Sequence, residues 1–316
     1  MPQKIAIIGA GMSGMACASH LAEAGVNVSV FDKGYNLGGR LATRIQDGFT
    51  FNHGAPGFAA EGSAFKSFTD KLKLLGALDN IGPPDAPLVG LPYMNCLLKP
   101  LTCNIDVHRS VEIGCINKNY EGWGLKSTKG QVYGTFNAVM ICIPAAQAQK
   151  LITSFKSDWI PRLKSVAYDP CLTMMIAFEG KQPNSKYASH ENHPLIWRQI
   201  RQSNNGEDND IPSRWVVHAS LDWSSRYLEC DVTKISNDFA REFLHLHNIE
   251  YKNPLFLQSH RWRYARVSNP LGRPSLFDDK LGLGLAGDWC LGPTVENAFD
   301  SGIDAANQIL LSIRQL

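Results

Sequence analysis

The stretch "AIIGAGMSGM", residues 6–15, ends a short apolar run with three closely spaced glycines. The run over residues 5–8 predicts a strand buried on both faces, which is typical of the middle of a parallel sheet. Gly9, Gly11 and Gly14 follow with G-x-G-x-x-G spacing. In this pattern the first glycine permits a tight turn, the second lets a pyrophosphate approach the backbone, and the third lets a helix pack closely on the strand. The stretch therefore predicts the start of a dinucleotide-binding fold.

The residues after the glycines continue the same pattern. A helix is expected over residues 12–24, with its positive N-terminal end toward the phosphates of a dinucleotide. "VNVSVF", residues 26–31, predicts the second strand, and Asp32 closes it 18 residues after Gly14. A carboxylate at this distance accepts hydrogen bonds from ribose hydroxyls. The candidate dinucleotide site also includes Met12, Ser13 and Lys33.

The next segment points to the kind of cofactor. With "NLGGRLATR", residues 36–44, the chain resembles the glutathione-reductase-type FAD fold in its amine-oxidase branch. The resemblance implies that Arg40 helps to hold the FAD pyrophosphate, a role that suits the planar fork of a guanidinium, and that Gly39 belongs to the same cofactor site. "FNHGAPGF", residues 51–58, resembles the loop that passes close to the flavin in this branch. The residues implied to contact the flavin there are Gly54, Ala55 and Pro56.

The C-terminal segment "LGLGLAGDWCLGPTVENAFDSGIDAA", residues 281–306, resembles the strand, Gly-Asp pair and helix that complete flavin binding in this fold. Its "GLGLAG" repeats the glycine spacing, but no second strand with a ribose acid follows, so one dinucleotide fingerprint is expected. The resemblance places Gly287 and Asp288 near the ribityl or phosphate region. It also places the helix start, with Val295 and Glu296, at the flavin edge that gains negative charge on reduction. Val111 corresponds to the position whose backbone meets adenine.

We predict an α/β protein in which a second domain is inserted into a discontinuous first one. The first is a Rossmann-type FAD-binding domain with a parallel sheet and an antiparallel meander, over residues 1–60, 105–160 and 276–316. The second is an α+β substrate domain with a mostly antiparallel sheet, over residues 61–104 and 161–275. Its expected strands are "LTMMIAFEG" (172–180), "PLIWRQI" (194–200) and "RWVVHASLDW" (214–223), and its expected helix is "ISNDFAREFLHLHNI" (235–249).

Further segments resemble a narrower group. "YDPCLTMMIAFEG", "WVVHASLDWSSRYLE", "HRWRYARV" and "AGDWCLG" are similar to bacterial renalase-like proteins of the FAD amine-oxidase superfamily. The resemblance implies an oxidase with non-covalent FAD that takes hydride from dihydropyridine isomers of NAD(P)H and passes the electrons to O2, giving hydrogen peroxide. Such a transfer restores aromaticity and needs no strong base, so no catalytic dyad or triad is expected.

The expected substrate, a dihydronicotinamide dinucleotide, calls for stacking surfaces and for cations that meet phosphate. "HRWRYAR" supplies the cations Arg261, Arg263 and Arg266. The candidate walls of the substrate pocket are His53, Phe58, Trp197, His218, Trp262, Tyr264 and Trp289.

Three other functions stay open on the sequence. An amine oxidase would transfer hydride from a neutral primary amine or polyamine held between aromatic rings. A desaturase or isomerase of the same fold would act on carotenoid-like lipids, but no apolar membrane-docking segment is visible. A non-enzymatic protein would keep FAD only as a structural or redox-sensing group.

The composition limits the kinds of binding partner that are expected. The 316 residues carry a formal net charge of +2, with no long run of like charges, so neither a nucleic acid nor a membrane is an expected partner. The 8 cysteines form no C-x-x-C pair and are expected to be reduced and buried, with no metal site and no flavin bond to Cys290. We expect a cytoplasmic monomer or weak homodimer.

Overall fold

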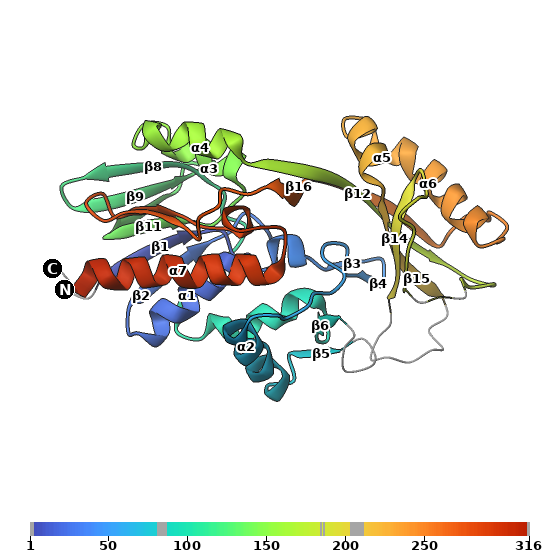
Figure 1. Cartoon of the computed structure of the whole chain (residues 1–316), viewed down its shortest axis with the longest axis horizontal. Helices are drawn as coiled ribbons and strands as arrows, with labels where there is room; N and C mark the ends of the chain where they lie inside the picture. The colour runs from blue at the N-terminus through green and yellow to red at the C-terminus, as the bar shows by residue number, and fades with distance from the viewer. Residues whose placement is uncertain (1–2, 81–86, 184, 186, 203–211, 315–316) are drawn as a thin grey trace.

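The computed structural model describes residues 3–80, 87–183, 185, 187–202 and 212–314. Two sheets lie at opposite ends of an elongated molecule (Figure 1). Two long strands, β12 (Ala167–Phe178) and β16 (Phe256–Asn269), pair with each other and extend from one end toward the other. The first sheet has the order β17 (Leu276–Asp278), β18 (Leu283–Leu285), β11 (Ala138–Ile141), β1 (Lys4–Ile8), β2 (Asn27–Phe31) and β7 (Ile105–His108).

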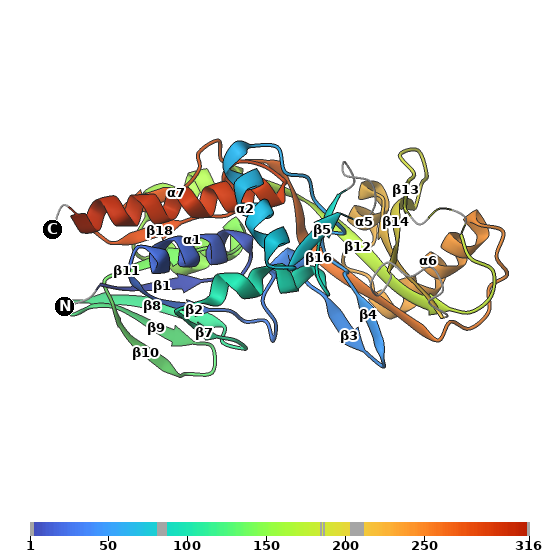
Figure 2. The same cartoon turned by 90° about the horizontal axis from the view of Figure 1, so that it is seen from below.

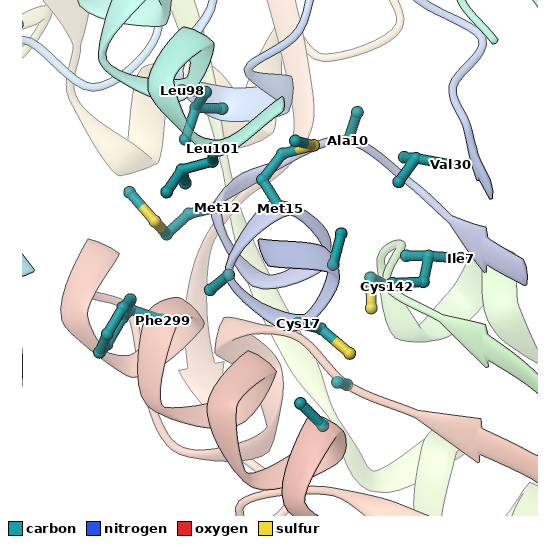
Figure 3. Close-up of a cluster of buried hydrophobic side chains, with 14 of the residues drawn as sticks. Ile7, Ala10, Met12, Met15, Cys17, Val30, Leu98, Leu101, Cys142 and Phe299 are labelled. Atoms are coloured by element: carbon teal, nitrogen blue, oxygen red, sulfur yellow. The ribbon is translucent and has the colours of Figure 1, made fainter. Parts of the chain in front are cut away.

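The first sheet confirms the predicted Rossmann-type architecture. β1 pairs in parallel with β2 and β11, and its residues 5–8 are buried. The helix α1 (Met12–Glu23) packs against α7 (Val295–Arg314) on one face of this sheet (Figure 2). A Cβ on Gly302 would lie 2.2 Å from the Ser13 carbonyl oxygen, so only glycine permits this closeness. Apolar side chains surround α1 in the resulting core, among them Met12, Met15, Leu98, Leu101 and Phe299 (Figure 3).

A three-stranded antiparallel meander covers the other face of the first sheet, as predicted. It consists of β8 (Ile113–Asn119), β9 (Gly122–Ser127) and β10 (Val132–Phe136). The short helices α3 (Ala145–Ile152) and α4 (Ile160–Ser165) pack beside it. A second core fills this side of the sheet and includes the fully buried rings of Trp123 and Trp289.

Residues 63–102 were expected to belong to the substrate domain, but they pack against the first sheet's helices. They form α2 (Ser63–Leu74), β5 (Leu78–Asn80), β6 (Leu88–Gly90) and the 3-10 helix η2 (Met94–Thr102). Their buried side chains join the same core as α1 and α7. The reason is the apolar content of Phe65, Leu72 and Leu97: α2 packs against α7, and η2 packs against α1 and β7. In packing, this segment therefore belongs with the Rossmann-type part and not with the second sheet.

The second sheet is antiparallel, with the order β13 (Tyr187–Ser189), β14 (Ile196–Gln202), β15 (Ser213–Ala219), β12 and β16. One face packs against α5 (Leu221–Arg226) and α6 (Val232–Leu246). Residues 221–223 were expected to continue a strand, which is wrong. The Ser220 hydroxyl accepts a hydrogen bond from the Trp223 N–H and so caps α5.

The opposite face of the second sheet is turned toward the hairpin of β3 (Arg44–Gln46) and β4 (Phe49–Phe51). Phe51 is fully buried there against Met175 and Val216. The hairpin lies between the two sheets (Figure 2). Beyond it, this face of the sheet is not packed on a helix and lines a cleft.

The cysteines correct one expectation. All eight are free thiols, but Cys103, Cys115 and Cys230 are exposed and not buried. These three lie on loops or on an open strand face, where the surrounding apolar run is too short to cover them. Among the described helices, none is both long and apolar enough to cross a membrane. In the same part of the chain, no group of three or more His, Cys, Asp or Glu side chains could hold a metal ion.

Candidate active site

A cleft of about 1900 Å³ runs between the two sheets. The turn after β1 and the residues after β2 line one end. β12, β14 and β16 line the other end, together with the loop after β4. The first is the glycine end of the cleft and the second is its sheet end.

The three glycines of the turn have different surroundings. A Cβ on Gly9, whose φ is +110°, would lie 2.4 Å from the Cys142 carbonyl oxygen. A Cβ on Gly14 would lie 1.9 Å from the Gly9 carbonyl oxygen. A Cβ on Gly11 would meet nothing closer than 3.9 Å, so this glycine borders open space in the cleft. Next to it, the buried Ser13 hydroxyl has no hydrogen-bond partner within the described chain.

Asp32 is held rigidly at the end of β2. Its Oδ2 accepts a hydrogen bond of 2.6 Å from the Ala10 N–H, and its Oδ1 accepts one of 2.6 Å from the Gly34 N–H. Burial raises the pKa of the carboxyl, although these bonds and the neighbouring Lys33 oppose the shift. Each carboxylate oxygen keeps a second lone pair for a ligand. The Val111 N–H donates to the Asp32 carbonyl oxygen at 2.8 Å, which fixes the backbone of Val111 beside Asp32.

Arg40 and Asp288 meet across the cleft although 248 positions separate them. Arg40 lies on η1 (Gly39–Leu41) and Asp288 on η4 (Asp288–Cys290). The guanidinium donates from Nη1 to Oδ2 at 2.6 Å and from Nη2 to Oδ1 at 2.5 Å, which is the bidentate geometry of a strong ion pair. Burial opposes the charge of Arg40, but Asp288 outweighs it and the pKa of Arg40 is raised.

The start of α7 also faces the cleft. The Thr294 hydroxyl accepts the Asn297 N–H at 3.0 Å and caps the helix. The N–H groups of Val295 and Glu296, at the first two positions, have no partner within a helix. The Glu296 carboxylate accepts the N–H groups of residues 61 and 62 at 2.8 and 2.7 Å, which ties that loop to the helix start.

The loop over residues 54–56 lies directly beside η1. The Ala55 N–H donates to the Arg40 carbonyl oxygen at 2.8 Å. A Cβ on Gly54 would lie 2.0 Å from the same oxygen, so only glycine fits this contact. Ala55, Pro56 and Gly287 line the cleft with these residues.

A row of polar residues crosses the sheet end. Arg198 on β14 is opposite His218 on β15, His218 is opposite Thr173 on β12, and Thr173 is opposite His260 on β16. Residues directly opposite in adjacent strands share a face, and all four line the cleft. Two positions along, the same face carries Met175 and Val216, which are buried under the hairpin. The row of polar residues therefore marks the boundary on this face of the sheet between the part buried under the hairpin and the part that lines the cleft.

His53 completes a cluster of three imidazoles at the sheet end. Its ring centroid lies 5.0 Å from that of His260, and the Trp262 indole N–H donates to the His53 carbonyl oxygen at 3.0 Å. The buried Nδ1 of His53 has no partner within the described chain. Burial lowers the pKa of His53 to about 3, with His260 and Arg44 adding to the shift. Burial also lowers the pKa of His218 to about 4 and that of His260 to about 4, so all three rings are neutral at pH 7.

The remaining predicted pocket residues divide into two groups. Trp197 stacks near His218, with centroids 6.3 Å apart, and Tyr264 packs edge-on against Tyr168 at 5.3 Å; both line the cleft. Phe58 and Trp289 adjoin the cleft but are core residues. Phe58 is bonded through its backbone to Leu88, and the fully buried Trp289 donates its indole N–H to the Ile143 carbonyl oxygen. Both also line the cleft, so each of them belongs to its wall as well as to the core.

The sequence reading missed Thr173, Arg198 and His260 as cleft residues. A usable signal was present in "LTMMIAF", where a polar residue occupies one position of an otherwise apolar strand. Of the predicted cations, Arg261 and Arg263 both pair with Glu229, an exposed carboxylate. Arg266 instead faces Trp197 in the cleft, 5.9 Å from its ring centroid.

Comparison with known proteins identifies the family. Residues 7–72 match the NAD(P)-binding Rossmann-like domain, and residues 104–310, more than half of the chain, match the flavin containing amine oxidoreductase family. The chain belongs to the flavin-containing amine oxidoreductases. Members of this family are FAD-dependent oxidoreductases, so the protein is an enzyme that uses FAD, and the non-enzymatic alternative is excluded.

Solved structures share the fold of this amine oxidoreductase over its whole length. A putative protoporphyrinogen oxidase from Exiguobacterium sp. 255-15 has a TM-score of 0.78 at 13% identity, with 98% of this chain and 99% of that chain covered. A double mutant of putrescine oxidase has a TM-score of 0.69 at 12% identity, with 98% and 100% covered. At these identities the likeness shows the fold alone.

A curated relative matches only a short part of the chain. The 4,4'-diapophytoene desaturase (4,4'-diaponeurosporene-forming) of Staphylococcus aureus is 49% identical over 51 residues, which are 16% of this chain and 10% of the desaturase. The match therefore spans about a tenth of the relative's length. It does not carry the desaturase activity over to this oxidoreductase.

The glycine end fits the cofactor of this family on its own geometry. The open side of Gly11 leaves room for a phosphate at the backbone, and the unpartnered Ser13 hydroxyl offers it a donor. The immobilised carboxylate of Asp32 offers acceptors for ribose hydroxyls. Groups that donate hydrogen bonds to phosphate and groups that accept them from ribose hydroxyls thus lie along one wall of the cleft, as binding of a dinucleotide requires.

Proposed function

We propose that this oxidoreductase oxidises dihydropyridine isomers of NAD(P)H to NAD(P)+ and uses O2 as the electron acceptor. The observation that carries the proposal is the chemistry of the sheet end. Aromatic rings and three neutral imidazoles line it, and the arginines 198 and 266 lie beside them. Such a pocket suits a planar ring joined to anionic groups and disfavours a cationic polyamine.

The residues of the glycine end would hold the cofactor. Gly9, Gly11, Met12, Ser13 and Gly14 would contact the pyrophosphate together with Arg40, which also lines the cleft. Asp32 would accept the ribose hydroxyls, and the Val111 carbonyl would meet adenine. When bound, FAD would supply the hydride acceptor, and the two electrons and the proton of that hydride, with one further proton from solvent, would convert O2 into hydrogen peroxide.

The start of α7 would stabilise negative charge on the bound flavin. The first two N–H groups and the positive end of a 20-residue helix converge where Val295 and Glu296 line the cleft. Fixed dipoles of this kind need no reorganisation when charge develops. The anchoring of loop 61–62 by the Glu296 carboxylate would keep the helix start in place.

The sheet end would position the substrate and tolerate the charge of the product. Loss of hydride turns a neutral dihydropyridine into a pyridinium cation. The low pKa values of His53, His218 and His260 keep these rings uncharged, so they do not repel that cation. The indole faces of Trp197 and Trp262 would attract it. No proton has to leave the substrate carbon, so positioning supplies most of the catalysis.

Oxidation of a neutral amine is the second candidate. One observation favours it: the imidazoles of His53, His218 and His260 are neutral and so place no positive charge of their own beside an incoming amine. The ring pair Trp197 and His218, inclined at 25°, could flank an amine. The arginines of the same pocket count against a substrate with several positive charges.

The test is anaerobic reduction of the holoprotein. The yellow protein is mixed with an isomerised NADH preparation rich in 2- and 6-dihydro forms, with ordinary NADH, and with a panel of amines, and flavin absorbance near 450 nm is followed. We expect bleaching by the isomers alone, reversed by air with formation of hydrogen peroxide. Bleaching by an amine and not by the isomers would replace the proposal with amine oxidation.

A further inference from the structure

The outer part of the sheet end contains two arginines on one aromatic ring. The Arg198 guanidinium lies 4.4 Å from the ring centroid of Trp197, and that of Arg266 lies 5.9 Å from it. Within the described residues, neither arginine forms an ion pair with a carboxylate, whereas Arg261 and Arg263 both pair with Glu229. The Nε of Arg198 is buried and has no hydrogen-bond partner in the same part of the chain.

Two strand irregularities aim these side chains into the cleft. The pairing of β14 with β15 shifts register between Ile196 and Arg198, so Trp197 is an extra residue and both it and Arg198 line the cleft. The pairing of β12 with β16 shifts between Asp169 and Cys171, which places Arg266 opposite Asp169. A bulge redirects side chains at the cost of regular pairing, and bulges are common next to active sites.

In the part of the chain that the structure describes, no carboxylate forms an ion pair with Arg198 or Arg266, although Asp169 lies directly opposite Arg266 in the strand pairing and also lines the cleft. Arg198 lies directly opposite His218 and is one cause of the low pKa of that imidazole. Trp197 offers only a ring face to the two guanidinium groups. The guanidinium groups of Arg198 and Arg266 lie near the ring of Trp197, and the Nε of Arg198 is an unused hydrogen-bond donor. An anion bound here would pair with both charges.

We propose that Trp197, Arg198 and Arg266 form an anion-binding subsite at the outer end of the substrate pocket, and that it takes the phosphate groups of a dinucleotide substrate. This inference rests on the proposed function and adds to it the residues that select the substrate. Guanidinium groups match phosphate oxygens in pairs, and the indole between them keeps both side chains extended. The subsite would favour dinucleotides over a free dihydronicotinamide riboside.

The first test measures binding without turnover. Oxidised holoprotein, saturated with FAD, is titrated calorimetrically with ADP-ribose, which carries the phosphates but no reducible ring. We expect Arg198→Gln and Arg266→Gln each to weaken binding about tenfold, because each removes one charge-assisted contact. We also expect the affinity of the unaltered protein to fall with salt more steeply than that of the variants.

The matched control is Arg241→Gln. Arg241 also lies over an aromatic ring, 5.2 Å from the Tyr251 centroid, but it is on α6 outside the cleft. ADP-ribose affinity should be unchanged in this variant. Arg266 is exposed, so its substitution should leave the flavin spectrum and folding intact even if Arg198→Gln does not fold. Unchanged ADP-ribose binding in Arg266→Gln, or no binding to the unaltered protein, would overturn the inference.

A second test separates this inference from the proposed function. The rate of flavin reduction is compared for the dihydro isomers of NADH and for the corresponding riboside without phosphate. A preference for the dinucleotide that Arg266→Gln abolishes supports the subsite, and equal rates in both proteins overturn it. If no dihydropyridine reduces the flavin but ADP-ribose binding still depends on Arg198 and Arg266, the proposed reaction is wrong and the anion subsite stands.

Discussion

Substitution of Arg40 and substitution of Asp288, the two members of one ion pair, should lower the stability of the protein by different amounts. The Arg40 side chain is 30% exposed in the cleft, whereas that of Asp288 is 7% exposed. Arg40→Met would leave a buried carboxylate without its partner. Asp288→Asn would leave a guanidinium that water can reach through the cleft.

The expected magnitudes follow from this difference in burial. Removal of one member of a buried pair costs about 3–5 kcal/mol, because the remaining charge stays uncompensated. Loss of a hydrogen bond to a charged group that water can partly replace costs about 1.5–3 kcal/mol. Taken at the middle of these ranges, Arg40→Met should reduce the free energy of unfolding by about 2 kcal/mol more than Asp288→Asn.

The assay is urea unfolding of the protein after removal of FAD, so that cofactor affinity does not contribute. A separate flavin titration should show that both variants bind FAD at least about tenfold more weakly, since each loses a charge-assisted contact at the cofactor wall. Arg241→Met, on an exposed pair of 3.8 Å with Asp238, serves as the control and should change stability little. If Asp288→Asn destabilises the protein more than Arg40→Met, the reasoning from burial is refuted.

Three further predictions rest on single contacts. Gly11→Ala should fold normally but bind FAD poorly, because the φ of −79° at this position suits alanine and the added Cβ would occupy the space that a phosphate needs. Gly14→Ala should fail to fold, because its Cβ would lie 1.9 Å from the Gly9 carbonyl oxygen. Thermal unfolding with and without FAD distinguishes the two variants. The low pKa of His53 means that the unfolded chain binds a proton between about pH 6.5 and 3 that the folded chain does not, so the free energy of unfolding falls as pH falls through this window. His53→Gln should reduce that fall by about 1.4 kcal/mol per pH unit in urea titrations, and an unchanged pH slope would contradict a buried neutral ring. Glu296→Gln should lower stability by about 0.3–1 kcal/mol through the loss of a charge at the start of α7, measured by thermal unfolding at low and high salt.

The glycine end could be predicted from the sequence because each of its steps is local. The apolar run, the three glycines and the acid after the second strand lie within residues 5–32, and the spacing alone determines the strand, turn and helix. The contacts of Asp32 with Ala10 and Gly34 join neighbouring turns of this unit. The polypeptide has little freedom to arrange such a segment in another way.

The sheet end could not be predicted in the same way, because its site is built across strands. Arg198, His218, Thr173 and His260 lie on four strands, and only the register brings them into one row. The bulge at Trp197 leaves no mark in the alternation of apolar and polar residues. A bulge shifts every later side chain by one position, so a pattern read strand by strand cannot say which residues face the cleft.

Errors in the expected elements have a related cause. "VVHASLDW" alternates as a strand would, but a hydroxyl cap at Ser220 starts a helix after Ala219. Residues 61–104 were expected to belong to the inserted substrate domain. Their apolar side chains instead complete the core around α1 and α7, a choice that depends on three-dimensional complementarity.

The strand β16 connects the two ends of the cleft through contacts made from one short segment. The Trp262 indole N–H is bonded to the His53 carbonyl oxygen, the Ala265 carbonyl oxygen accepts a bond of 3.4 Å from Arg40, and Arg266 faces Trp197. Residues 262–266 therefore touch the imidazole cluster, the arginine of the glycine end and the proposed anion subsite. Because the register shift with β12 lies in this segment, restoring regular pairing there would move all three contacts together. A deletion within residues 263–265 should thus weaken FAD binding and ADP-ribose binding at once, whereas Arg266→Gln should weaken only the second.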